Sequence, residues 1–264
     1  MAEITVNTFH KRKNTNEKLV MVTAYDAIGA AAAYEAGIDI LLAGDSMANT
    51  ALGFKNTLPL SMEEALFHTA AVKRGAPDAF VIFDMPFMSY QISDEEALRN
   101  AARAIKEINA DAVKLEGGAD HAPLIAKLVN AGIPVMAHIG LLPQKVKTSG
   151  GYKAAGKTED AARQLLEDAR KVEEAGAFSV VLECMPADVA AEITSAITIP
   201  TIGIGSGAGC SGQVQVLTDV LGLSSFTPRH AKHYAEIGEI MRNALKQYAN
   251  DVRQGTFPGK ENSF

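Results

Sequence analysis

The chain has 264 residues, of which 47% are hydrophobic, and a formal net charge of −6. One α/β barrel of roughly 250 residues fits this length, whereas the acidic balance argues against the basic stripe that a nucleic-acid partner requires. No stretch approaches the ~20 apolar residues of a membrane span, and the N-terminal sequence lacks the layout of a signal peptide. We therefore expect a cytoplasmic protein without nucleic-acid or membrane partners.

Apolar and β-branched runs predict strands, and segments with helical periodicity between them predict helices. In chain order, the predicted strands are residues 19–23, 38–44, 79–83, 112–116, 134–138, 179–183, 200–204 and a weaker run within 214–223. Helices are predicted over residues 26–36, after capping boxes at Ser61 and Ser93, and over residues 231–252. The basic cluster at residues 10–13 is interpreted as a solvated helix end.

Strand and helix alternate along the chain with mostly short connections, which predicts an α/β fold of the (β/α)8 (TIM) barrel type. An open doubly wound sheet is the alternative. No change in composition divides the chain, so residues 1–264 are expected to form a single barrel domain with a C-terminal helix and tail. Residues 140–157 follow the fifth strand without predicted structure and are interpreted as a lid or binding loop, or else as an ordinary surface excursion.

Four predicted strands end in a carboxylate, namely Asp45, Asp84, Glu116 and Glu183. A carboxylate at the end of a buried strand is costly unless something pairs with it, and ligands bind at the C-terminal ends of barrel strands. The first three close neighbouring strands without cysteine nearby, so their oxygen ligands predict Mg²⁺ rather than Zn²⁺. For Asp45, the alternative is an N-cap of the following helix.

Three further side chains at strand ends suggest carbanion chemistry. Lys114 lies two residues before Glu116 on the same face, where it can neutralise a substrate carboxylate or an enolate, unless the two form only a buried ion pair. His138 could donate to an oxyanion or be structural. Glu183 has apolar neighbours that raise its proton affinity, which suits a general base, although a pairing or capping role is the alternative.

A Gly-rich run at residues 203–212 matches the dinucleotide pattern G-x-G-x-x-G in one register only. The acidic residue that should follow about 20 residues later is missing. The run is therefore interpreted as a tight loop after the seventh strand, with backbone N–H groups and room for a flat ligand.

Over essentially its whole length, the chain resembles the ketopantoate hydroxymethyltransferase family. The shared segments include Met21-Val22-Thr23-Ala24-Tyr25-Asp26, Gly44-Asp45-Ser46, Asp84-Met85-Pro86-Phe87, Val113-Lys114-Leu115-Glu116-Gly117-Gly118, His138-Ile139-Gly140-Leu141, Pro143-Gln144, Gly150-Gly151-Tyr152 and Leu182-Glu183-Cys184. The resemblance implies an enzyme that uses Mg²⁺ to transfer a hydroxymethyl group from 5,10-methylenetetrahydrofolate to 3-methyl-2-oxobutanoate. The product would be 2-dehydropantoate (ketopantoate), in the committed step toward pantothenate and coenzyme A.

Carried over by position, the residues that would hold Mg²⁺ are Asp45, Asp84 and Glu116, and those that would bind the 2-oxo acid are Asp45, Ser46, Asp84, Lys114 and His138. Glu183 would remove the C3 proton. The resemblance also implies a homo-oligomer, commonly a decamer. The chain departs from the family pattern at Ser211, Thr218 and Arg229-His230, which puts folate or subunit contacts in question rather than the reaction.

Two other functions are compatible with these residues. One is a Mg²⁺-dependent lyase or mutase of the phosphoenolpyruvate mutase/isocitrate lyase type, which shares the metal and the enolate. The other is a barrel that binds a 2-oxo acid without catalysis, although burying so many unused charges would be destabilising.

Overall fold

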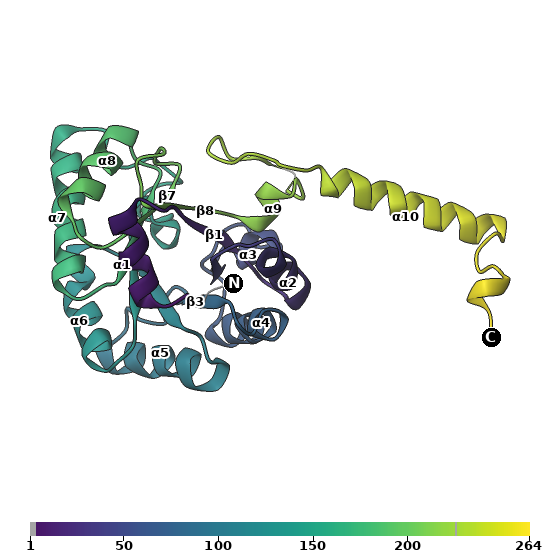
Figure 1. Ribbon diagram of the computed structural model, residues 1–264, viewed down its shortest axis with the longest axis horizontal. Coiled ribbons are helices and arrows are strands. Elements are labelled where there is room, and N and C mark those ends of the chain that lie inside the picture. The colour runs from purple at the N-terminus through teal and green to yellow at the C-terminus, as the bar shows by residue number, and fades with distance from the viewer. Residues whose placement is uncertain (1–3, 225) are drawn as a thin grey trace. The chain divides into compact units, whose positions relative to one another are not determined.

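The computed structural model describes residues 4–224 and 226–264, and within them the chain forms a closed barrel of eight parallel strands in chain order (Figure 1). The strands are β1 (Leu19–Thr23), β2 (Ile40–Ala43), β3 (Phe80–Asp84), β4 (Ala112–Glu116), β5 (Val135–Gly140), β6 (Ser179–Glu183), β7 (Thr201–Ile204) and β8 (Gly212–Gln215). Because β8 pairs with β1, the predicted barrel is confirmed and an open sheet is excluded.

Helices follow most of the strands, and α2 and α4 to α8 cover the barrel from outside (Figure 1). The helices of the described residues are α1 (Val6–Thr15), α2 (Ala27–Glu35), α3 (Met47–Thr50), α4 (Met62–Gly75), α5 (Asp94–Ile108), α6 (Ala122–Asn130), α7 (Glu159–Glu174), α8 (Ala187–Ala196), α9 (Leu217–Val220) and α10 (Ile237–Gln254), with short 3₁₀ turns η1 (Ala119–His121), η2 (Pro143–Lys145) and η3 (Lys260–Asn262). The capping box predicted at Ser61 is present: its hydroxyl accepts from the Glu64 N–H, and the Glu64 carboxylate accepts from the Ser61 N–H.

The last part of the barrel confirms one prediction and corrects another. Residues 205–211, all of them described, connect β7 to β8 without a helix, in agreement with the tight loop predicted after the seventh strand, and the strand–helix alternation is interrupted there. The predicted eighth strand was placed too late, because residues 212–215 form β8 and Leu217–Val220 are helical. β8 follows a run of Gly and small polar residues and has few apolar residues of its own. Its hydrophobic pattern is therefore too weak to predict a strand at this position.

The chain divides into two compact units, the first ending at Val216 and the second spanning Leu217–Phe264. In the second unit, the predicted C-terminal helix begins at Ile237, six residues after the predicted start at residue 231, and ends at Gln254. None of the helices in the described ranges is long and apolar enough to cross a membrane.

Strand alternation separates the barrel interior from the layer beneath the helices. On β3, Phe80 and Ile82 belong to the interior apolar cluster, and Asp84 continues the same alternation at the strand's C-terminal end. The next three strands follow this pattern. Their interior positions change from apolar residues near the N-terminal end to charged residues at the C-terminal end.

Helix α1 closes the N-terminal end of the barrel. Phe9 is fully buried, and its ring packs edge-on against Phe178 at a centroid distance of 5.0 Å and against Phe80 at 5.3 Å. Phe80 begins β3, and Phe178 directly precedes β6. These contacts place α1 at the end of the barrel opposite the strand-end carboxylates.

The basic cluster at residues 10–13 is not the solvated helix end that was predicted. Lys13 Nζ donates to the carbonyl oxygens of Thr194, Ile197 and Ile199 at 2.9, 2.7 and 2.9 Å. Burial lowers the pKa of Lys13, and the negative charge of Glu173 opposes that change. Lys13 thus binds carbonyl groups left unpaired at the end of α8.

The substitution Phe9→Ala should lower the free energy of unfolding by about 3–5 kcal/mol, because it leaves a cavity beside the rings of Phe80 and Phe178. Urea unfolding followed by circular dichroism would measure the change. Phe67→Ala is the matched control, because Phe67 is 70% exposed, and it should shift the same quantity by no more than about 0.5 kcal/mol. Equal effects of the two substitutions would mean that the Phe9 contacts do not stabilise the barrel.

Candidate active site

The predicted site residues from the middle of the chain converge at the C-terminal end of the barrel. Asp84, Lys114, Glu116, His138 and Glu183 project from the successive strands β3, β4, β5 and β6. In the sheet register, Asp84 pairs with Lys114 and Glu116 pairs with His138. All but Glu183 are at most 4% exposed. Regular alternation on neighbouring strands therefore brings five side chains to one interior layer.

Lys114 and Asp84 form a buried ion pair at the centre of this layer. Lys114 Nζ lies 2.6 Å from Asp84 Oδ1, and the Asp45 N–H donates to Asp84 Oδ2 at 3.0 Å. Burial opposes the charge on Lys114, but the negative charges of Asp84, Glu116 and Asp45 outweigh it and raise the pKa of the amine. Lys114 is therefore a fixed cation, paired with Asp84 rather than with Glu116.

Asp45 and Glu116 are carboxylates whose proton affinity is raised. Burial, followed by the charge of Asp84, raises the pKa of Asp45 to about 7. Burial, followed by the charge of Asp45, raises the pKa of Glu116 well above its ordinary value. Asp45 does not cap α3, whose N-cap is Ser46. The alternative interpretation of Asp45 as the N-cap of the following helix is therefore wrong.

Ser46 is tied to the edge of the site by hydroxyl contacts. The Tyr25 hydroxyl lies 2.9 Å from Ser46 Oγ, and Thr23 Oγ1 donates to the Tyr25 hydroxyl at 2.7 Å. Tyr25 stands in a segment that carries the family resemblance, but the sequence gave no reason to assign it a role. Tyr25, on the connection between β1 and α2, therefore holds Ser46 in place beside Asp45.

His138 lies between two carboxylates. Its Nε2 is 3.2 Å from Glu183 Oε2, and its Nδ1 is 3.8 Å from Glu116 Oε1. Neither contact has hydrogen-bond geometry, so both imidazole nitrogens and Glu116 Oε1 are buried polar atoms without a hydrogen-bond partner in the described part of the chain. Burial, and then the charge of Lys114, lower the pKa of His138 well below its usual value. The imidazole is therefore neutral near pH 7.

Glu183 closes β6 at the side of the site opposite Asp84. Its side chain is 16% exposed, more than those of the other carboxylates. The N-cap of the following helix α8 is Pro186. The capping role that the sequence left open for Glu183 is thus excluded.

The donor set of the site suits a hard divalent cation. Asp45, Asp84, Glu116 and Glu183 outnumber the one buried cation, Lys114, and Glu116 Oε1 lacks a partner. No three His, Cys, Asp or Glu side chains within residues 4–224 and 226–264 are arranged to hold a metal ion by themselves. Mg²⁺ fits this set, because it commonly takes one or two carboxylates and completes its shell with water and substrate.

Sequence reasoning assigned no role to Gln144, which lies within the predicted loop at residues 140–157, or to Tyr90, whose hydroxyl contacts Gln144 Oε1 at 2.8 Å. Gln144 belongs to η2 and contacts both Asp45 and Glu116. Farther along the loop, burial and then the charges of Asp45, Glu183 and Glu116 raise the pKa of Tyr152. The loop therefore carries polar groups into electrostatic range of the site.

The Gly-rich run packs closely on α8. A Cβ atom at Gly207 would lie 2.5 Å from the Ala187 Cβ, so this position has no space for a side chain. Ser206 Oγ donates to the Leu182 carbonyl at 2.8 Å, which ties the end of β7 to β6 beside Glu183. Ser211, one of the departures from the family pattern, directly precedes β8 and so lies at the N-terminal end of the barrel.

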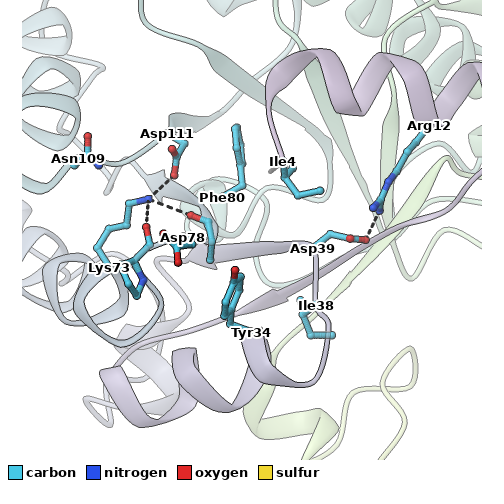
Figure 2. Close-up of a pocket in the computed structure, with 12 residues that line it drawn as sticks. Ile4, Arg12, Tyr34, Ile38, Asp39, Lys73, Asp78, Phe80, Asn109 and Asp111 are labelled. Carbon is cyan, nitrogen blue, oxygen red and sulfur yellow. Dashed lines mark hydrogen bonds and ion pairs between the residues drawn. The ribbon is translucent and has the colours of Figure 1, made fainter. Parts of the chain in front are cut away.

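A hollow of about 760 Å³ lies beside α1, also at the N-terminal end of the barrel (Figure 2). Its two basic side chains are already paired: Arg12 Nη1 lies 2.5 Å from Asp39 Oδ2, and Lys73 Nζ lies 2.8 Å from Asp111 Oδ2. None of the predicted site residues is among those that line it. The hollow is therefore separate from the candidate active site.

Comparisons with known proteins agree with the family resemblance. A family model described as ketopantoate hydroxymethyltransferase matches residues 3–260. The 3-methyl-2-oxobutanoate hydroxymethyltransferase of Clostridium novyi (strain NT) is 53% identical over 261 residues, which cover 98% of this chain and 95% of the relative.

Solved structures share the fold at much lower identity. A phosphonopyruvate hydrolase in complex with oxalate and Mg²⁺ aligns with a TM-score of 0.63 and 12% identity, over 98% of this chain and 93% of that one. A 2,3-dimethylmalate lyase of the PEP mutase/isocitrate lyase superfamily aligns with a TM-score of 0.60 and 15% identity, over 99% and 92%. At these identities the similarity shows a common barrel and no more.

The raised pKa of Asp45 predicts a pH-dependent effect of Asp45→Asn on stability. Burial raises the pKa of Asp45 in the folded protein to about 7 from its ordinary 3.8, so between these pH values the unfolded chain releases a proton that the folded protein keeps, and stability falls as the pH rises. In EDTA, the variant should gain on the order of 1–3 kcal/mol relative to wild type between about pH 5.5 and about pH 8. Denaturant titrations at both pH values would measure this gain, and a pH-independent difference would contradict the assignment.

Proposed function

The chain belongs to the ketopantoate hydroxymethyltransferase family, and from that membership we propose that it transfers a hydroxymethyl group from 5,10-methylenetetrahydrofolate to 3-methyl-2-oxobutanoate. The product is 2-dehydropantoate, and water completes the release of the one-carbon unit from the folate. One observation carries the proposal: the buried Lys114–Asp84 pair lies among carboxylates on one side of the barrel, and the more exposed Glu183 faces it from β6.

Asp45, Asp84 and Glu116 are the residues that would hold Mg²⁺, directly or through water. When bound, the ion would act as a Lewis acid toward the keto oxygen of the 2-oxo acid. The excess of buried carboxylates supports this role, as does Glu116 Oε1, which has no partner within the described residues. The phosphonopyruvate hydrolase that shares the barrel binds Mg²⁺ together with oxalate, an anion whose adjacent oxygens resemble those of a 2-oxo acid.

Glu183 is proposed as the base that removes the C3 proton. It must be ionised to do so, and its 16% exposure leaves it accessible to a substrate. His138 is neutral and lies 3.2 Å from the Glu183 carboxylate. The neutral imidazole therefore places no positive charge beside the base.

Lys114 is proposed to stabilise the enolate that forms when the C3 proton leaves. Its charge is permanent and buried, so its electrostatic effect on a nearby developing anion is strong. Ser46, fixed by Tyr25, would donate to the substrate carboxylate. The enolate carbon then forms the new carbon–carbon bond to the methylene carbon of the folate as one C–N bond of that carbon breaks. Water supplies the hydroxyl oxygen as the second C–N bond breaks, and both nitrogens take up protons to leave tetrahydrofolate.

The folate is proposed to bind over the 2-oxo acid, at the open end of the barrel, where residues 141–157 can cover it. The charges that act on Tyr152 indicate that this loop reaches toward the carboxylates. The family resemblance implies a homo-oligomer, commonly a decamer. We propose that this chain also assembles into a homo-oligomer.

A lyase or mutase of the phosphoenolpyruvate mutase/isocitrate lyase type is not favoured. The structures that suggest it are 12–15% identical to this chain, whereas the hydroxymethyltransferase relative is 53% identical over nearly all of it. A barrel without catalytic activity is not favoured for the same reason.

Glu183→Gln should slow exchange of the C3 proton by at least ~100-fold, because an amide cannot serve as the general base. Proton NMR of 3-methyl-2-oxobutanoate in D₂O with Mg²⁺ measures this exchange, and later addition of methylenetetrahydrofolate reports transfer. Glu192→Gln, on the exposed surface of α8, is the matched control and should exchange at the wild-type rate. Wild-type exchange in the Glu183 variant would assign the base to another residue.

Asp84→Asn should weaken Mg²⁺-dependent binding of 3-methyl-2-oxobutanoate by at least about 10–100-fold, the range found when groups around a metal site are altered. The loss follows because a neutral amide holds neither the cation nor Lys114 as a carboxylate does. Calorimetric titration with and without Mg²⁺ would measure it, with circular dichroism to verify folding. Unchanged affinity would remove Asp84 from the cation site.

A further inference from the structure

Gln144 is a buried neutral residue with polar contacts on every side. Its side-chain Nε2 donates to Asp45 Oδ2 at 3.1 Å and to the Met85 carbonyl at 3.0 Å. Its Oε1 accepts from the Tyr90 hydroxyl at 2.8 Å and from Gln91 Nε2 at 3.3 Å. Both amide hydrogens and both lone pairs of the oxygen are thus used, which is the full capacity of a carboxamide.

These partners fix the direction in which the amide faces. The Met85 carbonyl can only accept, so the NH₂ group must point toward it and toward Asp45. Tyr90 secures the opposite end, because its hydroxyl accepts from the Glu116 N–H at 3.1 Å and donates to Gln144 Oε1. A flipped amide would turn its oxygen toward both the Met85 carbonyl and the Asp45 carboxylate.

The backbone of the same residue holds the second carboxylate. The Gln144 N–H donates to Glu116 Oε2 at 3.0 Å, which leaves Glu116 Oε1 as the oxygen without a partner in the described part of the chain. Three residues earlier, the Leu141 N–H donates to the Glu183 carbonyl at 2.9 Å. The short segment 141–144 therefore spans from β6 to the two carboxylates.

We propose that Gln144 is a positioning residue for the cation site, which orients Asp45 through its carboxamide and Glu116 through its N–H. Each contact occupies one carboxylate oxygen and so determines which oxygen remains for an ion. Groups that orient metal ligands in this way commonly contribute 10–100-fold to metal affinity. The inference rests on the proposed function, because it takes these carboxylates as cation ligands.

The test measures binding of Mn²⁺, a spectroscopic substitute for Mg²⁺, to the substrate-free protein by the loss of the free-ion EPR signal. Gln144→Glu keeps the shape but replaces the NH₂ donor with a second acidic group, and it should weaken Mn²⁺ binding by about 10–100-fold. Tyr90→Phe keeps the carboxamide but removes the hydroxyl that anchors it, so a smaller loss is expected. Gln164→Glu, on the exposed face of α7, controls for added charge and should bind as wild type does.

Each outcome separates the inference from the function on which it rests. Loss of Mn²⁺ affinity in folded Gln144→Glu and Tyr90→Phe proteins, with affinity kept in Gln164→Glu, supports the positioning role. Wild-type affinity in the first two variants, with only a lower melting temperature, would make Gln144 a structural anchor of the loop and overturn the inference. Wild-type protein that binds no Mn²⁺ would instead count against the proposed function. If Gln144→Glu does not fold, Tyr90→Phe and Gln144→Ala decide the question.

Discussion

The candidate site depends on one constraint, which is that four carboxylates and a single lysine share the interior of a barrel. Lys114 compensates only part of that negative charge, and it does so through a direct pair with Asp84. Burial, and then the remaining negative charge, raise the pKa of both Asp45 and Glu116. A protein that keeps such a cluster must either protonate it or provide a cation, because isolated buried charges are strongly destabilising. The proposed chemistry uses the cation.

Much of this arrangement was predictable because strand geometry is regular. Four parallel runs that end in acids, three of them on neighbouring strands of one barrel, must bring those acids to one end, and alternation directs Asp84, Lys114 and Glu116 to the same side. The pairing of Lys114 with Asp84 was not predictable, since the choice between two nearby carboxylates depends on register. Tyr25, Tyr90 and Gln144 come from connections whose course no periodic pattern encodes.

The wrong predictions have physical causes as well. A basic cluster normally indicates a solvated surface, but Lys13 meets carbonyl groups from a segment more than 180 residues away. The eighth strand was placed too late because β8, Gly212–Gln215, begins within the Gly-rich run itself and contains only one apolar residue, Val214. Recognition of the family, by contrast, depends on many short segments in the same order. Errors in the bounds of individual helices and strands therefore did not affect it.

The packing of Phe9 against Phe80 and Phe178, which holds α1 over the N-terminal end of the barrel, affects the kinetics of a two-substrate reaction. Below the carboxylates the barrel is filled by packed apolar side chains and closed by α1, so ligands approach the carboxylates from the C-terminal end of the strands. A small acid bound at the carboxylates would have to arrive before a large carrier that sits above it. The product could then leave only after that carrier has gone. Closure of the N-terminal end of the barrel thus imposes an order of substrate binding and product release. No residue at the strand ends needs to enforce that order.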